Sequence, residues 1–276
     1  MRIAVTGGGG ELGRSLVAYL AARDYRVVSI DRGLPPAGEL RPGVSYLVAD
    51  VRDFGATVAA LRGCDAVIHL AAHRSPLHHP DTEVYVNNTA GSYHVLSAAS
   101  TLGIDRVCLA SSINAIGAAF SRAPRFDYFP VDEAHPSYTE DPYSLSKWVL
   151  EQQADAFARR FERMRIASLR FHWLLESRER ALAVTAANPE VARRHLWAYT
   201  GLEAACRACL LAVSADFTGH QACLIVAPTT VAAEPSLELA RRYYPDTPIR
   251  GELPGFAAFF DCGRAERVLG WRHDEE

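Results

Sequence analysis

Short apolar runs rich in β-branched residues alternate along the chain with longer segments of helical periodicity. The short runs lie at residues 3–5, 26–30, 45–48, 66–70, 106–110, 166–171 and 223–226, and the clearest helical segments at 13–23, 82–102 and 142–161. This alternation is typical of β-α-β units, in which helices connect parallel strands. We therefore predict an α/β fold, a Rossmann-like doubly wound parallel sheet with helices on both faces.

The regular alternation weakens after residue 165, where prolines interrupt the short elements. We therefore divide the chain into a Rossmann domain, residues 1–165, and a smaller substrate-binding lobe, residues 166–276, partly interleaved with the sheet. The lobe is expected over the carboxyl ends of the strands, where open α/β sheets bind ligands.

Composition narrows the possible partners. The chain has 276 residues, is 49% hydrophobic and carries a formal net charge of -3, so it lacks the basic field that nucleic acids require. No apolar run approaches the roughly 18 to 20 residues of a membrane span, and no signal peptide is evident. We expect a cytoplasmic protein with no nucleic-acid or membrane partner, and its six cysteines as buried free thiols.

A glycine-rich turn follows the first predicted strand and opens the first helix. It reads Thr6-Gly7-Gly8-Gly9-Gly10-Glu11-Leu12-Gly13, as either G-x-G-x-x-G or T-G-x-x-G-x-x-G, and Gly10 and Gly13 serve in both registers. Glycines there let the backbone approach a pyrophosphate at a helix N-terminus. By itself the motif also fits a plain turn. We expect the cofactor-binding residues here to be Gly7, Gly10, Glu11, Leu12 and Gly13.

Asp31 strengthens the nucleotide interpretation. It follows the second predicted strand, eighteen residues after Gly13, close to the ~20 expected for a carboxylate on the adenosine ribose. A carboxylate there repels a 2′-phosphate, which favours NAD over NADP, although Arg32 would accept that phosphate if it turned inward. Asp50 and Val51, at the end of the third strand, are candidates for contact with the adenine; Asp50 is equally a candidate helix cap.

Tyr143 and Lys147 carry the candidate chemistry. Four residues apart on a predicted helix, they share one face. A free tyrosine, pKa near 10, is only about one part in a thousand phenolate at pH 7, so a neighbouring ammonium would activate it. The alternative is a surface tyrosine stacked on a lysine stem. The strand at 106–110 ends in Ser111-Ser112, and we choose Ser112, with Ser111 as the fallback, to hold a substrate oxygen beside Tyr143.

Taken together, these motifs resemble the extended short-chain dehydrogenase/reductases, also called the NAD-dependent epimerase/dehydratase family, over nearly the whole chain. The matching segments are Thr6-Gly7-x-x-Gly10-x-x-Gly13, Val67-Ile68-His69-Leu70-Ala71-Ala72, Asn88-Thr89-Ala90-Gly91-Ser92, Ser111-Ser112 ahead of Gly117, Tyr143 to Lys147, and Asp261-x-x-Arg264-Ala265-x-x-x-Leu269-Gly270-Trp271.

The resemblance implies a role for each matched position. Tyr143 would be the general acid/base, Lys147 would bind the nicotinamide ribose and lower the tyrosine pKa, Ser112 would orient the substrate, and Asn88 would support the helix and a proton relay. Leu70, Ala71 and Ala72 would line the cofactor, together with Tyr143 and Lys147. The resemblance also implies a homodimer through the helices at 82–102 and 142–161.

The chain departs from the family pattern at the substrate end. Trp173 stands where nucleotide-sugar members commonly have asparagine, and the Gly-Pro that follows there is absent. Ile113-Asn114 replaces the Asp-Glu pair of the 4,6-dehydratases, which disfavours dehydration. The C-terminal lobe is shorter than in nucleotide-sugar epimerases and nearer to that of aldose and uronate dehydrogenases, which suggests a smaller substrate.

The loop from His73 to His79 follows the fourth strand and should overhang the substrate. We list His73, Arg74, Ser112, His172 and Trp173 as candidate substrate residues; a solvated loop is the alternative for His73 and Arg74. His78-His79 lacks a third ligand at a convincing spacing, so we predict no metal.

We therefore expect the chain to be an NAD-dependent oxidoreductase or epimerase that transfers a hydride between nicotinamide and a hydroxyl-bearing carbon of a sugar or sugar derivative. Two narrower alternatives are a UDP-sugar 4-epimerase with tightly bound NAD and an aldose or uronate dehydrogenase. A third, of another class, is an NAD(P)-binding regulator without chemistry.

Overall fold

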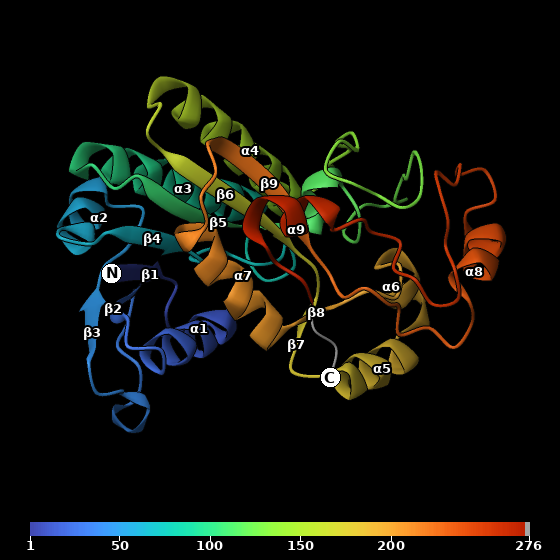
Figure 1. Ribbon diagram of the computed structural model, residues 1–276, viewed down its shortest axis with the longest axis horizontal. Helices are drawn as coiled ribbons and strands as arrows, with labels where there is room; N and C mark the ends of the chain where they lie inside the picture. The colour runs from blue at the N-terminus through green and yellow to red at the C-terminus, as the bar shows by residue number, and fades with distance from the viewer. Residues whose placement is uncertain (274–276) are drawn as a thin grey trace.

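A computed structural model describes residues 1–273 and shows one large parallel sheet (Figure 1). Within these residues the sheet has seven strands in the order β3-β2-β1-β4-β5-β6-β9, so the predicted α/β fold is confirmed. The strands are β1 (Arg2–Thr6), β2 (Arg26–Asp31), β3 (Val44–Val48), β4 (Ala66–His69), β5 (Arg106–Ser112), β6 (Arg165–Phe171) and β9 (Gly219–Ile225).

The strand boundaries lie within one or two residues of the sequence prediction, except at the start of β9. β9 begins at Gly219 rather than at residue 223, because the first half of the strand is only half-buried and its polar residues hide it from an apolar pattern. β3 ends at Val48, so Asp50 and Val51 lie in the turn beyond the strand rather than at its end.

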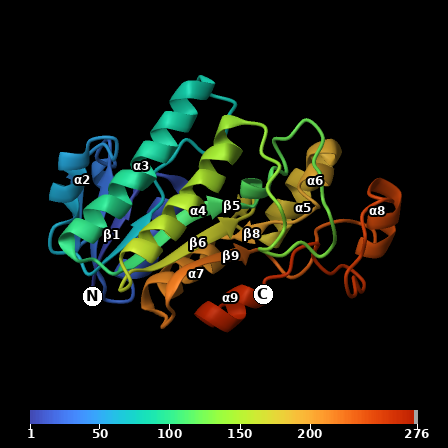
Figure 2. The same ribbon diagram turned by 90° about the horizontal axis from the view of Figure 1, so that it is seen from above.

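Helices cover both faces of the sheet, and the strand residues alternate between them. Ile3 and Val5 pack with one set of helices and Ala4 with the other. Figure 1 shows α3 and α4 above the sheet and α1 and α7 below it, and in Figure 2 α3 and α4 lie side by side. The first layer is α2 (Phe54–Leu61), α3 (Asp81–Leu102) and α4 (Pro142–Arg160); the second is α1 (Glu11–Ala21), α7 (Leu202–Ser214) and α9 (Gly263–Leu269).

A smaller lobe lies beyond the carboxyl ends of the strands. It contains β7 (Leu174–Leu175), α5 (Arg178–Ala187), α6 (Pro189–Arg194), β8 (Thr200–Gly201) and α8 (Ser236–Tyr243). Its apolar core also includes residues from the segment that precedes α4. Phe129 forms an isolated β-bridge with Ile249, and Val131 forms one with Phe260.

The division of the chain at residue 165 stays a prediction. β6 and β9 belong to the main sheet, while part of the segment before α4 packs with the lobe. Residues 274–276 of the predicted second domain lie outside the described residues.

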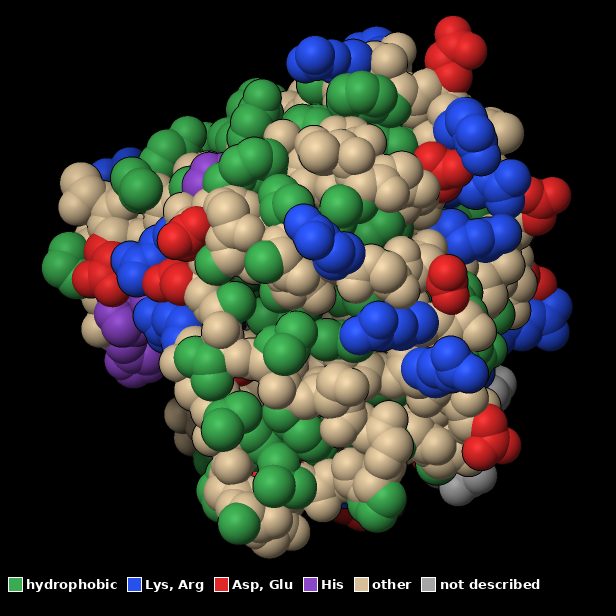
Figure 3. Space-filling view, turned by 90° about the vertical axis from the view of Figure 1, so that its left-hand side faces the viewer, with side chains coloured by type: hydrophobic (Ala, Val, Ile, Leu, Met, Phe, Trp, Pro, Cys, Tyr) green, Lys and Arg blue, Asp and Glu red, His purple; other side chains and the backbone are tan. Residues whose placement is uncertain are grey.

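The surface is of mixed charge. On the face seen in Figure 3, acidic and basic side chains are interspersed, in keeping with a formal net charge of -3. In residues 1–273, every helix falls short of the length or the hydropathy that a membrane span requires.

Candidate active site

The glycine-rich turn brings α1 into direct contact with β1 and with the chain that follows β4. Gly7 has φ +73, and a Cβ on it would lie 2.6 Å from the backbone nitrogen of Ala71. A Cβ on Gly13 would lie 2.1 Å from the carbonyl oxygen of Gly7, so neither position accommodates a side chain. Gly10 begins α1 without a side-chain cap, which leaves backbone N–H groups of the first turn for an anion. The turn therefore fits a pyrophosphate.

A cavity of about 530 Å³ opens beside this turn. Most of the predicted cofactor residues line it. Glu11 is exposed, Leu12 and Gly13 are buried in the contact of α1 with the sheet, and Tyr143 and Lys147 are not among the residues of the cavity wall. The predicted residues in its wall are Gly7, Gly10, Asp31, Arg32, Asp50, Val51, Leu70, Ala71 and Ala72, and it is also lined by Arg14, Leu34, Glu39, His73 and Asn87.

Asp31, the last residue of β2, stands in the cavity wall with its carboxylate held by backbone. One oxygen accepts a hydrogen bond from the Gly9 N–H at 2.8 Å and the other from the Arg32 N–H at 2.7 Å. A carboxylate has about four acceptor sites, so two remain for the hydroxyls of a ribose. Asp50, in the same wall, is paired with Arg52 at 2.6 Å, and this hydrogen bond lowers the Asp50 pKa.

Tyr143 lies in the first turn of α4, which Asp141 caps by accepting a hydrogen bond from the Ser144 N–H at 2.9 Å. The tyrosine is 7% exposed, and the edge of its ring meets Phe120. Burial raises the pKa of Tyr143 to about 12, while a hydrogen bond from Ser112 and the charge of Arg74 act in the opposite direction. Tyr143 therefore needs stabilisation of its phenolate before it acts as a base.

The hydrogen bonds around Ser112 set the direction of its proton. The Ser112 oxygen accepts the Asn114 backbone N–H at 3.1 Å and the Asn114 side-chain amide at 3.3 Å. The Asn114 carbonyl oxygen in turn accepts the Ala119 N–H at 2.8 Å, which fixes the orientation of that amide. With its acceptor sites occupied, the Ser112 hydroxyl is left with its own proton to donate, and Ser112 lowers the pKa of Tyr143.

Lys147 is buried one helical turn from Tyr143, with its nitrogen 5.7 Å from the centre of the tyrosine ring. The ammonium donates to the Ala110 carbonyl at 2.6 Å, near the end of β5. Burial lowers the pKa of Lys147 to about 8, and the charge of Glu151 opposes that shift. Because Lys147 is not among the groups that shift the Tyr143 pKa, its predicted effect on the tyrosine stays a prediction.

Asn88, on α3, connects the loop after β4 to α4. Its side chain accepts from the His73 N–H at 2.8 Å and donates to the His73 carbonyl at 2.9 Å. It also donates to the Ser146 hydroxyl at 3.0 Å, between Tyr143 and Lys147 in the sequence. In this structure Asn88 is therefore a positioning residue that aligns the cavity wall with α4.

The remaining candidates lie on both sides of this centre. Arg74 is largely exposed and pairs with Glu11 at 2.9 Å. His172 follows Phe171, whose register partner on β5 is Ser112. His172 is buried, its Nδ1 accepts the Trp173 N–H at 2.7 Å, and burial lowers its pKa well below the ordinary value. Trp173 stacks on His195 with ring centres 4.9 Å apart.

Sequence reasoning assigned no role to the residues that support Ser112 and Lys147. Asn114 was noted only because it replaces an acidic residue of the dehydratases. Glu151 accepts from the Ser111 hydroxyl at 2.6 Å and forms a buried ion pair with Arg170 at 2.7 Å. The spacing of Glu151 one turn after Lys147 was the available signal, whereas nothing in the sequence joined it to Arg170.

A glycine cradle at the first helix of a parallel sheet, together with a serine at a strand end and a tyrosine and a lysine on the helix that follows, defines a Rossmann-type oxidoreductase. The model of the NAD dependent epimerase/dehydratase family matches residues 3–194, and the chain belongs to this family. It is an enzyme of the NAD-dependent oxidoreductase or epimerase type, so the predicted family, enzyme class and NAD cofactor are confirmed.

Two curated relatives share about a third of their aligned residues with the chain. An L-arabinose 1-dehydrogenase (NAD(P)(+)) of Haloferax volcanii is 34% identical over an alignment of 184 residues. This alignment covers 64% of this chain and 69% of the relative. A putative UDP-glucose 4-epimerase of Methanocaldococcus jannaschii is 31% identical over 161 residues, 57% of this chain and 51% of the relative. The chain thus spans about half the length of the second relative.

Solved structures share the fold over the whole chain. The UDP-glucose-4-epimerase of Stenotrophomonas maltophila with bound NAD and formylated UDP-arabinopyranose has a TM-score of 0.75 at 22% identity, covering 100% of this chain and 94% of that one. A mutated uronate dehydrogenase has a TM-score of 0.72 at 19% identity, with 100% and 82% covered.

Proposed function

We propose that the protein is a sugar dehydrogenase that oxidises a hydroxyl group of an aldose or a uronate with NAD+. The observation that carries the chemistry is the buried phenol of Tyr143 with the Lys147 ammonium 5.7 Å from its ring centre, beside Ser112, which lowers the Tyr143 pKa. These groups would meet a carbinol at the carboxyl end of β5, beside the glycine cradle.

The cofactor would lie along the cavity. Asp31 would bind the adenosine ribose, Gly7 and Gly10 with the N-terminus of α1 would hold the pyrophosphate, and Lys147 would reach the nicotinamide ribose. When bound, NAD supplies the acceptor for the hydride that leaves the carbinol carbon. Arg32 is the residue that would accommodate NADP, and the carboxylate of Asp31 favours NAD.

The proton follows a separate path from the hydride. Tyr143 Oη would take the hydroxyl proton of the substrate, and the single proton of the Ser112 hydroxyl would stabilise the phenolate before transfer. The buried ammonium of Lys147 is fixed by the Ala110 carbonyl, so its charge stays at the strand end when substrate excludes water.

A small substrate is supported by the residues after β6. The position that commonly carries asparagine in nucleotide-sugar members holds Trp173, whose ring stacks on His195. His172 Nε2 and His195 Nδ1 are buried and have no hydrogen-bond partner among the described residues. Buried polar atoms of this kind usually have partners, and hydroxyls of a sugar would supply them. The relative that oxidises L-arabinose by its name also supports this choice.

We also propose a homodimer through α3 and α4. These helices lie side by side and carry large apolar side chains on their outer surface: Val86, Tyr93, Leu145 and Trp148 are 57%, 48%, 37% and 38% exposed. Exposed apolar side chains gathered on two adjacent helices favour a protein interface. Light scattering of the purified chain should give the mass of two copies; the mass of one copy would refute the dimer.

The second candidate is a UDP-sugar 4-epimerase, favoured by the similarity to a putative UDP-glucose 4-epimerase. One experiment separates the two. The purified chain is incubated with NAD+ and, in turn, aldoses, uronates and UDP-sugars, while NADH absorbance and product composition are followed. Steady NADH formation from a free sugar supports our proposal. Interconversion of UDP-sugars without net NADH would replace it by the epimerase.

A further inference from the structure

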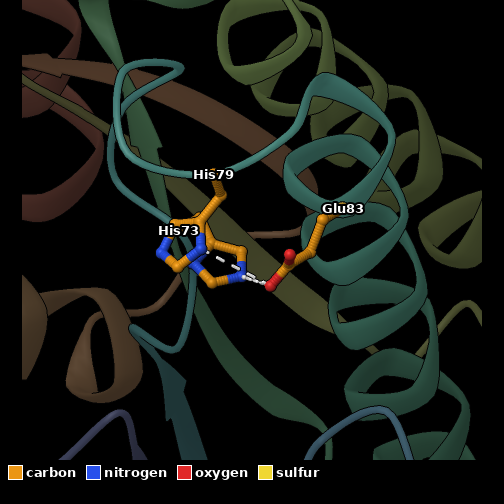
Figure 4. A group of neighbouring side chains, drawn as sticks. All are labelled: His73, His79 and Glu83. Atoms are coloured by element: carbon orange, nitrogen blue, oxygen red, sulfur yellow. Dashed lines mark ion pairs between the residues drawn. The ribbon is translucent and has the colours of Figure 1, made fainter.

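Two histidines and a glutamate converge beside the cofactor cavity. His73 and His79 lie at the two ends of the loop between β4 and α3, and Glu83 lies in the first turn of α3 (Figure 4). Their ligand atoms all lie within 4.8 Å of one another. The spacing of His78 and His79 had offered no third ligand, because the turn of the loop, and not the sequence, brings His73 and Glu83 together with His79.

We propose that His73, His79 and Glu83 form a binding site for a divalent transition metal, with Zn²⁺ as the ion that its donors fit. One Glu83 oxygen lies 3.4 Å from His73 Nε2 and 3.5 Å from His79 Nδ1. In a tetrahedral zinc site with bonds of 2.0 to 2.1 Å, neighbouring ligand atoms are about 3.3 Å apart. Both distances to the carboxylate therefore match the edges of a zinc tetrahedron.

His73 provides the independent sign that a ligand belongs here. Its side chain is 7% exposed, and Nε2, the atom that faces Glu83, has no hydrogen-bond partner of acceptable geometry among the described residues. Leaving a buried polar atom unsatisfied is destabilising, and a metal ion would remove that cost.

The donor set selects the class of ion. Two imidazoles and one carboxylate suit zinc and its neighbours, whereas Mg²⁺ and Ca²⁺ prefer sites built from oxygen alone. His79 and Glu83 are 40% and 43% exposed, so an ion has an entry path and water can take the fourth position. The His73 and His79 rings are tilted by 40° with their centres 3.8 Å apart, and metal binding would spread them through movement of the exposed His79.

Bound metal would fasten the loop to α3 at the wall of the cavity. His73 lines the cavity itself, and its backbone is already held by Asn88 through two hydrogen bonds. The metal would add a side-chain anchor to this backbone anchor, so the loop would be fixed at both of its ends.

The test is metal binding by the full chain, purified without a histidine tag and treated with a chelator. The parent, H79N, E83Q and H78N are dialysed to equilibrium against Zn²⁺, and bound zinc is counted by mass spectrometry. A parallel titration with Co²⁺ follows its visible absorption bands, which report imidazole and carboxylate coordination. H78N is the matched control, because His78 adjoins His79 but is not part of the cluster. Circular dichroism establishes that each variant is folded.

We expect one Zn²⁺ per chain for the parent and for H78N, and affinity at least tenfold weaker in H79N and E83Q, since even indirect partners of metal ligands contribute about 10–100-fold. A large excess of Mg²⁺ should not displace the zinc. Failure of the parent to bind Zn²⁺, or equal binding by parent and H79N, would overturn the proposal. Neither result depends on the sugar substrate.

Discussion

Replacement of Ser112 by alanine tests how the phenol of Tyr143 is activated. The Ser112 hydroxyl accepts both hydrogen bonds of Asn114, which leaves its own proton to donate, and Ser112 lowers the pKa of Tyr143. We therefore expect this proton to be donated to the tyrosine oxygen, so that loss of the bond raises the pKa of Tyr143. Oxidation of the substrate requires the phenolate, so the rise of kcat/KM with pH should move to higher pH in S112A.

The size of the shift follows from the strength of the bond. A hydrogen bond to a charged group contributes about 1.5–3 kcal/mol, and one pKa unit corresponds to about 1.4 kcal/mol. The apparent pKa in the kcat/KM profile should therefore rise by about one to two units. Below that pKa the phenolate fraction, and with it kcat/KM, falls about 10–100-fold.

The assay is the pH profile of sugar oxidation, followed through NADH absorbance. S144A is the matched control, since the buried Ser144 hydroxyl next to Tyr143 has no hydrogen-bond partner among the described residues. S112T keeps a hydroxyl and should restore part of the shift. A loss of activity in S112A that is the same at every pH would refute activation through this bond and leave Ser112 with substrate positioning alone.

Three further predictions concern the cofactor and the buried charges. D31N should raise the KM for NAD+ about tenfold or more, because it weakens a hydrogen bond to a charged group. It should also raise the kcat/KM with NADP+ relative to the kcat/KM with NAD+. If the ratio of these two values did not change, the role of Asp31 would be contradicted. Burial lowers the pKa of Lys147 to about 8 from 10.5, so the parent gains stability as pH rises between these values, by up to about 3 kcal/mol. The unfolding free energy of K147M relative to the parent, measured by urea titration, should therefore fall by that amount between pH 8 and 10.5. A constant difference between the two proteins would show that the ammonium is not desolvated. E151Q leaves Arg170 without its buried partner and should cost about 3 kcal/mol, whereas E190Q, which breaks an exposed pair, should cost less than about 1 kcal/mol; equal losses would be inconsistent with a buried pair.

Features built from neighbouring residues could be predicted from the sequence. Buried parallel strands are apolar on both faces, so runs such as β4 were visible as strands. The glycine turn and the Tyr143–Lys147 pair depend on local geometry, which spacing alone determines. Asp31 was predictable because one β-α-β unit fixes its distance from Gly13.

Features built from distant residues were not predictable in this way. Arg170 meets Glu151 because β6 lies beside β5 under α4, and Phe129 joins the C-terminal lobe through contacts with residues far along the chain. The cluster at Glu83 depends on the path of a loop between a strand and a helix. The direction of the Ser112 proton depends on a single amide orientation, that of Asn114, which no sequence pattern encodes.

The central claim is that Tyr143 moves the proton, and the kcat/KM of Y143F for sugar oxidation tests it most directly. Phenylalanine keeps the ring that packs on Phe120 and removes the reacting oxygen. The account predicts a loss of at least about a hundredfold, because a positioned acid/base contributes 10²–10⁴-fold. Y25F, a change at a tyrosine that packs against the core outside the site and outside the proposed dimer interface, keeps the parent rate. If Y143F turned over the sugar as fast as the parent, the mechanism would be wrong.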